Sequence, residues 1–417
     1  MASSSSAGIS WDLYPKSGRI QPHEPLEGYT LGGFHPVALG DTLCNGRYVI
    51  RHKLGFGQQS TVWLAWDNEH ANISNARPWV AVKIKTATAS ADSLFHDGEV
   101  GVLGILERHY RGTNQQGPRT FLLLLDAFRH AGPNGIHNCI VTEVLGHTLE
   151  DLFSSYPADG DLLPPDLVLR YSQQLLQGLD MVHRLGIAHG DICPANIALT
   201  CDQAQENPDT FFATVGANPR TVAYESDASR PAGLPQQLIA CAVWDAWCVD
   251  RETDVRILDW GSAFHMAENV TRPAHPAKLR PPETFFEHHV NFTHDLWMAG
   301  SVIYSMVFQA APISSVTAPD HAIEMMANLK KEDENTAAPR QEMLEDSFKV
   351  RRQENVRHCA GLASEVYEKD QFTEYDLWAV KFLLWPLQGL LRHDPTHRLS
   401  AKEAAASIAW TDYRRDT

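Results

Sequence analysis

The chain of 417 residues lacks the features that mark membrane and secreted proteins. It contains no apolar run of about eighteen residues, so we expect no membrane-spanning helix and no membrane partner. Its first residues, MASSSSAGIS, lack a basic segment followed by an apolar one, which argues against a secretory signal. These absences predict a protein of the cytoplasm, the nucleus or both.

Cysteine is also scarce and unpaired in pattern. The seven cysteines include no Cys-x-x-Cys pair, and their odd number favours reduced thiols over a disulfide framework. Cys241 and Cys248 lie in one loop-like segment and could bind a metal with nearby histidines. Their spacing matches no standard zinc site, so we favour plain thiols.

Basic residues are few relative to acidic ones. The chain has 35 Lys and Arg against 51 Asp and Glu, which gives a formal net charge of −16. This balance disfavours direct binding to nucleic acid and favours a basic partner or substrate. A solvated acidic surface explains the same charge, so charge alone does not choose between these interpretations.

Composition marks off an arm and an insertion from the rest of the chain. Residues 1–29 are rich in Ser, Pro and Gly, and we predict a mostly disordered arm there. Residues from about 200 to 254 are polar and rich in Pro, Ala and Gly, apart from Trp244 and Trp247. That segment is predicted to be an insertion at the domain surface, partly ordered by its aromatic residues.

Between the arm and the insertion, β-rich runs come first and helical periodicity follows. The β-rich runs are residues 48–50, 53–66, 80–84, 121–125 and 139–145. Pro164-Pro165-Asp166 then introduces apolar residues at steps of three and four, up to Gly186, which predicts a helix.

Residues 189–196, His-Gly-Asp-Ile-Cys-Pro-Ala-Asn, follow this helix and lead into an apolar run. Asp191 stands five residues before Asn196, which is the arrangement that phosphoryl transfer needs. The aspartate can accept the proton of a substrate hydroxyl, and the asparagine oxygen can hold a divalent ion on nucleotide phosphates. We interpret His189 as a buried packing residue. An ordinary Asp/Asn turn would explain this stretch alone, so the hypothesis depends on other stretches.

Three features nearer the N-terminus support that hypothesis. Gly55 and Gly57 lie at a turn between β-rich runs, where missing side chains let backbone N–H groups approach phosphate oxygens, although a plain hairpin is the alternative. Lys83 lies inside an apolar strand and is costly to bury without a partner. Glu99, which shares helical spacing with apolar residues, can supply the opposite charge and fix the lysine over the α and β phosphates.

Further residues extend the pattern. Asp259, two residues before a glycine, is our second metal ligand, because two oxygens must converge on the β and γ phosphates. Glu143 and Leu145 lie where an apolar strand gives way to a connector, so their backbone groups could bind an adenine. Glu283, in an Arg-Pro-Pro-Glu element, is predicted to form a buried structural charge pair with Arg398.

In this order, the motifs resemble a eukaryotic protein kinase over about residues 45 to 412. More narrowly, the chain resembles a divergent member of the SR-protein kinase family. That likeness is carried by residues 34–37 (Phe-His-Pro-Val), 46–48, 53–57, 60–67 and 143–147, and by the insertion. The resemblance implies an α+β, two-lobed kinase fold. Residues 30–145 would form a small, antiparallel β-rich N-lobe with one main helix, and 146–417 a larger, mainly helical C-lobe carrying the insertion.

The resemblance further implies a monomeric enzyme that uses ATP and Mg²⁺ to phosphorylate serine or threonine in basic, Arg/Ser-rich proteins. It assigns catalysis to Asp191, Lys83, Glu99 and Asn196, and the metal to Asn196 and Asp259. The implied nucleotide-binding residues are Leu54, Gly55, Gly57, Val62, Ala81, Lys83, Glu143 and Leu145.

Two departures from the family bear on activity. Cys193 stands where the family has a lysine that stabilises charge on the transferring phosphoryl group. Gly190 replaces the arginine that pairs with a phosphorylated activation loop in many kinases, and the stretch from 262 to 280 offers only Ser262 and Thr271 as acceptors. We predict a kinase, slow if Cys193 limits it, that needs no loop phosphorylation. The alternative is an ATP-binding pseudokinase that acts as a scaffold.

Overall fold

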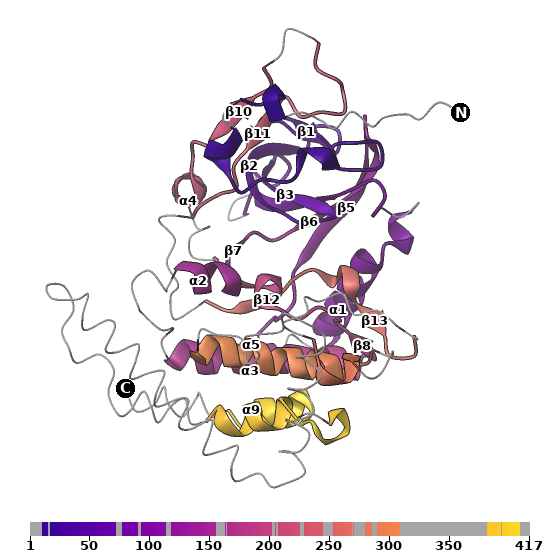
Figure 1. The fold of residues 1–417 in the computed structure, drawn as a ribbon, viewed down its shortest axis with the longest axis vertical. Helices are drawn as coiled ribbons and strands as arrows, with labels where there is room; N and C mark the ends of the chain where they lie inside the picture. The colour runs from indigo at the N-terminus through magenta and orange to yellow at the C-terminus, as the bar shows by residue number, and fades with distance from the viewer. Residues whose placement is uncertain are drawn as a thin grey trace, which may run out of the picture. The chain divides into compact units, whose positions relative to one another are not determined.

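The computed structural model of the protein describes residues 11–15, 17–71, 77–90, 93–113, 118–155, 163, 165–201, 205, 207–225, 229–244, 253–268, 270, 280–285, 290–308, 382–392 and 394–408. The chain divides into two compact units. The first comprises Met1–Arg108, Leu122–Gly146 and Thr200–Asp250, and the second comprises His109–Phe121, His147–Leu199 and Arg251–Thr417. The fold is α+β, with strands concentrated in the first unit and helices in the second (Figure 1).

The first unit is built on one antiparallel sheet. Its strands are β1 (Thr42–Leu43), β2 (Tyr48–Phe56), β3 (Ser60–Asp67), β4 (Trp79–Lys85), β5 (Leu124–Gly132) and β6 (Gly135–Thr142). They lie in the order β1-β2-β3-β4-β6-β5. Val80, Val82 and Ile84 enter one apolar cluster while Ala81 enters another. Side chains alternate between the faces of a strand, so both faces of this sheet are covered.

The strand expected at 121–125 begins later, at Leu124. Phe121 is fully buried in the second unit, where it bridges Ile257 and its ring lies 5.8 Å from that of Tyr110. The apolar run at 121–125 therefore contributes first to the core of the second unit and then to the sheet of the first. Hydrophobic periodicity does not distinguish such a run from a single strand.

The described part of the N-terminal arm, residues 11–15 and 17–29, differs from the prediction of disorder. Residues 11–13, 17–20 and 26–28 form short 3-10 turns. Apolar residues of the arm are buried in one cluster with Phe34 and with residues of the predicted insertion: Tyr14, Ile20, Leu26 and Tyr29 from the arm, and Leu234, Leu238 and Ala240 from the insertion. Bulky side chains spaced among Ser, Pro and Gly were sufficient to anchor an irregular segment, because burying them offsets the entropy of ordering it.

The insertion packs within the first unit rather than standing apart from it. The helix α4 (Pro208–Val215) begins at Asn207, whose side chain accepts hydrogen bonds from two backbone amides. Its residues Phe211 and Val215 are buried against Trp79 and Trp244. The strands β10 (Thr221–Ala223) and β11 (Gln237–Ile239) form an antiparallel pair beside the arm. Trp247 and Cys248 lie outside the described residues.

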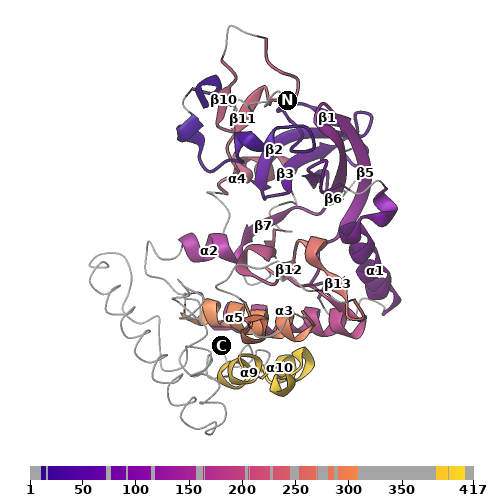
Figure 2. The same cartoon turned by 45° about the vertical axis from the view of Figure 1, so that its right-hand side comes forward.

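The second unit is mainly helical in its described part. Its elements include α2 (Leu149–Ser155), α3 (Pro165–Arg184), α5 (Thr293–Phe308), α9 (Leu384–Leu390) and α10 (Ala401–Ala406). The helix α3 packs against α5 and α10, and α5 also packs against α9 (Figures 1 and 2). Among the helices described, none is long and apolar enough to cross a membrane.

Two short antiparallel ladders support the loops of the second unit. The strands β8 (Ile187–Ala188) and β13 (Phe264–His265) form one, and β9 (Ile197–Thr200) and β12 (Val255–Ile257) form the other. The strand β7 (Leu145–Thr148) spans the point where the chain passes from the first unit to the second.

Candidate catalytic site

The loop 189–196 of the second unit brings Asp191 and Asn196 together, as the sequence predicts. The helix α3 ends before Gly186, which has a φ of +74°, and β8 leads directly into the loop. Pro194–Asn196 form a 3-10 turn that starts at Cys193. This turn folds Asn196 back, so that its Nδ2 donates to the carbonyl oxygen of Asp191 at 2.8 Å and to Asp191 Oδ2 at 3.1 Å.

The ladder between β9 and β12 places Asp259 near the same loop. Ile197 lies opposite Ile257, and the N–H of Leu258 donates to the carbonyl oxygen of Asn196 at 2.8 Å. Asp259 follows directly, with a left-handed φ of +54°. The antiparallel register therefore sets two oxygen-bearing side chains, Asn196 and Asp259, at one end of the ladder.

These two residues fit a Mg²⁺ ion that a nucleotide brings with it. The amide nitrogen of Asn196 is directed at Asp191, which leaves the amide oxygen as its cation ligand. Within the described part of the chain, no group of three or more His, Cys, Asp or Glu side chains could hold a metal. Magnesium typically takes one or two protein oxygens and completes its shell with phosphates and water, so a two-residue site suffices.

Asp191 has the electrostatics of a proton acceptor. Burial raises the pKa of its carboxyl above the ordinary value, and repulsion from Asp259 and Asp295 raises it further. His189 and the hydrogen bond from Asn196 offset this rise only in part. Its Oδ1 is buried and has no hydrogen-bond partner. A carboxylate in this state holds a proton more readily than an exposed one does.

Asp295, to which sequence reasoning gave no role, holds the loop in place. Its carboxylate is fully buried and accepts from the backbone amides of His189 and Gly190, each at 2.8 Å. His183 Nε2 lies 3.0 Å from it. Burial alone would raise the pKa of Asp295, but these partners hold the pKa below its ordinary value. An aspartate in the first turn of α5, followed by Trp297, was the available signal.

His189 is a packing residue, as the sequence predicts. Its ring is buried, meets Trp260 edge to face at 4.6 Å between centroids, and bonds the carbonyl oxygen of Leu258 through Nε2 at 2.8 Å.

Cys193 supplies no positive charge to the loop. Its side chain is buried, and burial raises the pKa of its thiol to about 12, with the nearby Asp191 adding to the rise. The thiol is therefore neutral near pH 7. The carboxylate oxygen Oδ1 of Asp191, two residues away, is correspondingly left without a hydrogen-bond donor.

The backbone geometry at position 190 requires glycine. Its φ is +80°, and a Cβ built there would lie 2.7 Å from the carbonyl oxygen of Ser262. An arginine therefore cannot occupy this position without moving the backbone. Ser262 belongs to a described turn, whereas Thr271 lies outside the described residues.

In the first unit, Lys83 and Glu99 form the predicted ion pair. Lys83, in the middle of β4, lies 2.8 and 3.0 Å from the two carboxylate oxygens of Glu99. Glu99 lies in the first turn of α1 (Gly98–Gly112), where Leu103 and Leu106 are buried on the same helix. The side chain of Glu99 is 2% exposed and that of Lys83 is 18% exposed. The glutamate thus fixes a lysine that keeps access to solvent.

The residues expected to line a nucleotide also lie in this unit. Ala81 is buried in an apolar cluster, and Leu54 and Val62 pack against it. A Cβ at Gly55 would meet nothing within 4 Å, and one at Gly57 would reach only Ser60 Oγ at 4.0 Å. Neither glycine is demanded by internal packing, which is consistent with a turn that leaves space for a ligand.

The connector after β6 is held by neighbouring segments of the first unit. Glu143 donates its N–H to the carbonyl oxygen of Leu123 at 3.2 Å and accepts from the N–H of Leu123 at 2.8 Å. The carbonyl oxygen of Val144 accepts from Gln205 Nε2 at 3.1 Å and from Cys201 Sγ at 3.3 Å. The start of the insertion therefore fixes the backbone between Glu143 and Leu145, a contribution that the sequence did not indicate.

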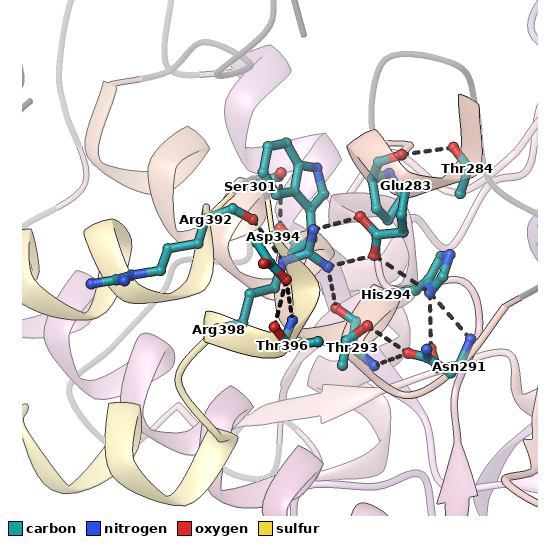
Figure 3. Close-up of polar contacts among 12 residues, drawn as sticks. Glu283, Thr284, Asn291, Thr293, His294, Ser301, Arg392, Asp394, Thr396 and Arg398 are labelled. Carbon is teal, nitrogen blue, oxygen red and sulfur yellow. Dashed lines mark hydrogen bonds and ion pairs between the residues drawn. The ribbon is translucent and has the colours of Figure 1, made fainter. Parts of the chain in front are cut away.

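The predicted pair of Glu283 and Arg398 is confirmed (Figure 3). Glu283 lies in the 3-10 turn Pro282–Phe285, and Arg398 follows the 3-10 turn Pro395–His397. Both side chains are buried in the second unit.

No protein-family model matches the chain. It is 38% identical over 188 residues to protein kinase dsk1 of Schizosaccharomyces pombe, and this match covers 44% of this chain and 32% of dsk1. It is also 38% identical over 188 residues to SRSF protein kinase 3 of Homo sapiens, covering 44% and 30%. With serine/threonine-protein kinase SRPK of Physarum polycephalum it shares 26% identity over 404 residues, covering 91% and 89%.

The fold and these relatives define the class: the chain is a homologue of the serine/threonine protein kinases. Within that class, the curated relatives are kinases of the SRPK family, and the chain is similar to one of them along 91% of its length. The matched part spans less than a third of dsk1 and of SRSF protein kinase 3, at 32% and 30% of their lengths.

Proposed function

We propose that this protein is a serine/threonine protein kinase that transfers the γ-phosphate of ATP to protein hydroxyls. The observation that carries the proposal is the convergence of Asp191, Asn196 and Asp259 at one end of the β9–β12 ladder. Phosphoryl transfer requires a base for the acceptor hydroxyl and metal ligands for the phosphates of the donor, and these three residues can supply both.

Each residue has a role in the proposed reaction. Asp191 orients the acceptor hydroxyl and takes its proton. Asn196 and Asp259 hold Mg²⁺, which when bound neutralises charge on the β and γ phosphates. Lys83, fixed by Glu99, binds the α and β phosphates. Leu54, Val62 and Ala81 contact the adenine, the turn at Gly55 and Gly57 covers the phosphates, and backbone groups of Glu143 and Leu145 bind the adenine edge.

In the transfer itself, a bond forms between the acceptor oxygen and the γ-phosphorus while the bond from that phosphorus to the β–γ bridging oxygen breaks. The acceptor proton passes to the carboxylate of Asp191, and ADP leaves with the bridging oxygen. The raised pKa of Asp191 favours this proton acceptance over what an exposed aspartate provides.

The proposed substrates are basic, Arg/Ser-rich proteins. The net charge of −16 favours such partners, and two of the relatives are named for SR-type protein kinase activity. We further propose a monomer of the cytoplasm, the nucleus or both. Activity is proposed not to depend on activation-loop phosphorylation, since Gly190 has no side chain to pair with a phosphate.

The test is transfer of labelled γ-phosphate from Mg-ATP to an Arg/Ser-repeat peptide. Wild-type transfer that disappears in Asp191→Ala and in Lys83→Met would support the proposal. A peptide with lysine in place of arginine, and one with alanine in place of serine, report on substrate class. Transfer that survives in Asp191→Ala would exclude Asp191 as the base.

A second candidate is an ATP-binding pseudokinase that serves as a scaffold. It is favoured by Cys193, whose neutral thiol leaves the loop without the positive charge that the family's lysine provides. Wild type that binds Mg-ATP without any transfer would favour this candidate. A scaffold would also keep its partner binding in Lys83→Met.

A further inference from the structure

A buried ion pair links the N-terminal arm to strand β2. Glu24 Oε2 pairs with Lys53 Nζ, and Glu24 Oε1 accepts from the hydroxyl of Tyr29. The side chains of Lys53 and Glu24 are 0% and 2% exposed. Burial raises the pKa of Tyr29 well above its ordinary value, and the nearby carboxylate of Glu24 raises it further. The carboxylate therefore has a partner on each oxygen, in a site without water access.

Lys53 lies in β2 directly before Leu54, at the start of the proposed nucleotide-binding turn 54–57. It lies opposite Trp63, and the β2–β3 register shifts between Lys53 and Gly55. Its Nζ lies 5.3 Å from the ring centroid of Trp63 and 5.6 Å from that of Phe56. A shift of this kind turns the following residues relative to the sheet. The setting of Leu54 and Gly55 thus depends on where Lys53 is held.

The insertion also holds Lys53, through a hydrogen bond to the backbone of Lys53. The N–H of Ala242 donates to the carbonyl oxygen of Lys53 at 2.8 Å, and Cys241 forms a parallel bridge with Lys53. The arm in turn holds the insertion, because the hydroxyl of Tyr14 donates to the carbonyl oxygen of Pro235 at 2.5 Å. Lys53 is therefore fixed at its ammonium by the arm and at its backbone by the insertion.

We propose that Glu24 is a positioning residue for the nucleotide: through Lys53, it sets the glycine turn at residues 54–57 in the geometry that binds ATP. This inference rests on the proposed kinase function and adds a regulatory role for the arm. The arm and the insertion together hold β2 at Lys53. A change that displaces the arm should therefore lower nucleotide affinity, although no residue of the arm contacts ATP in this proposal.

The physical reason is the cost of a buried, unpaired ammonium. Without the Glu24 carboxylate, the Lys53 ammonium is left, among the described residues, with the rings of Trp63 and Phe56, which do not replace a full negative charge. The ammonium then gains by moving toward water, and the residues that follow Lys53 in β2 must move with it. A misplacement of about 1 Å can reduce a rate about a hundredfold.

The test compares two variants that each neutralise one buried carboxylate paired with a basic residue in or next to β2. Glu24→Gln breaks the pair beside the glycine turn. Asp67→Asn breaks the pair with Arg47 at the opposite end, where the two residues lie 2.9 Å apart and Asp67 is 2% exposed. The full chain is used, and the readouts are thermal unfolding, Kd for a fluorescent ATP analogue with Mg²⁺, and KM for ATP and for an Arg/Ser peptide.

We expect both variants to lose stability but only Glu24→Gln to weaken the nucleotide. Its Kd and its KM for ATP should rise about tenfold to a hundredfold, with KM for the peptide unchanged. The double variant Glu24→Gln/Lys53→Met should recover most of this loss, because no unpaired charge remains. Equal loss of nucleotide affinity in Glu24→Gln and Asp67→Asn, or none in either, would overturn the proposal.

Hydrogen–deuterium exchange at residues 54–60 gives a readout that needs no catalysis. Exchange there should be faster in Glu24→Gln than in wild type or Asp67→Asn. If wild type transfers no phosphate, the proposed kinase activity fails while this exchange still decides the role of Glu24. Exchange that is unchanged in Glu24→Gln would refute the positioning role by itself.

Discussion

The guanidinium of Arg398 and the carboxylate of Glu283 face each other in the second unit and share two hydrogen bonds of 2.5 Å (Figure 3). Arg398 also donates to the carbonyl oxygen of Thr293 at 2.9 Å and lies 5.1 Å from the ring centroid of Trp297. One side chain thus joins the start of α5 to the turn that carries Glu283. Bidentate pairs of this kind fix orientation as well as charge.

Arg398→Met should strongly destabilise the protein, because it leaves the buried carboxylate of Glu283 uncompensated. We expect a loss of about 3–5 kcal/mol in the free energy of unfolding. Urea denaturation followed by circular dichroism would measure it. The variant Arg398→Met/Glu283→Gln should be more stable than Arg398→Met alone. A single variant with wild-type stability would show that the pair is not needed for folding.

Gly190→Ala should be destabilising by about 1–3 kcal/mol, because its left-handed backbone and the nearby carbonyl of Ser262 oppose any side chain. Gly104→Ala is the matched control: it lies inside α1, where a Cβ would meet nothing within 4 Å. That change should stabilise by about 0.5–1 kcal/mol. Thermal unfolding of both variants would check the signs, and a gain of stability in Gly190→Ala would contradict the geometry.

Local patterns predicted the charge pairs and several of the strands, for a physical reason. Lys83 stands in an apolar strand, where an ionised group needs a partner, so a search for Glu99 was justified. The pair of Glu283 and Arg398 was predicted instead from the Arg-Pro-Pro-Glu element. Both pairs are confirmed. Strands β2, β3 and β4 overlap the predicted runs, because their side chains alternate between buried faces, whereas β1 was missed and β5 lies mostly beyond the run expected at 121–125.

The residues that hold the loop and the arm could not be predicted in the same way. Asp295 binds two backbone amides, and no pattern in the sequence says which amides a distant carboxylate will accept. Glu24 lies in a segment whose Ser, Pro and Gly content indicates disorder, while its buried neighbours Tyr14 and Tyr29 are spaced irregularly. Tertiary burial overrode composition there.

Asp191→Asn should abolish phosphate transfer and yet raise stability near pH 7. Burial raises the pKa of Asp191, so the folded chain holds this proton more tightly than the unfolded chain. Folding stability therefore falls as pH rises from the ordinary value of 3.8 through the raised value. The gain in Tm of Asp191→Asn should be largest above that window and shrink below it. A pH-independent difference would indicate another cause.

Phosphatase treatment of purified protein should leave activity unchanged. The strand β13 is paired with β8, and the N–H of Met266 donates to the carbonyl oxygen of Gly186 at 2.8 Å, so residues 264–266 are held without a phosphate. Transfer to an Arg/Ser peptide before and after treatment, with mass spectrometry of Ser262 and Thr271, would measure this. Activity that disappears together with a phosphate on either residue would refute it.

Cys193→Lys should raise kcat by about a hundredfold to a thousandfold, the usual effect of one preorganised electrostatic donor. The thiol, with its pKa raised to about 12, is neutral and supplies no positive charge to stabilise the negative charge on the transferring phosphoryl group. A lysine ammonium could also pair with the buried Oδ1 of Asp191. Cys193→Met is the control, because it adds length without charge.

Single-turnover transfer to the Arg/Ser peptide separates the chemical step from product release, and so decides what Cys193 does. A rise in Cys193→Lys but not in Cys193→Met would show that charge at this position limits the rate. If wild type transfers nothing and only Cys193→Lys is active, the natural protein works as a pseudokinase. If Cys193→Lys and Cys193→Met both match an active wild type, the missing lysine is compensated and the cysteine does not slow the enzyme.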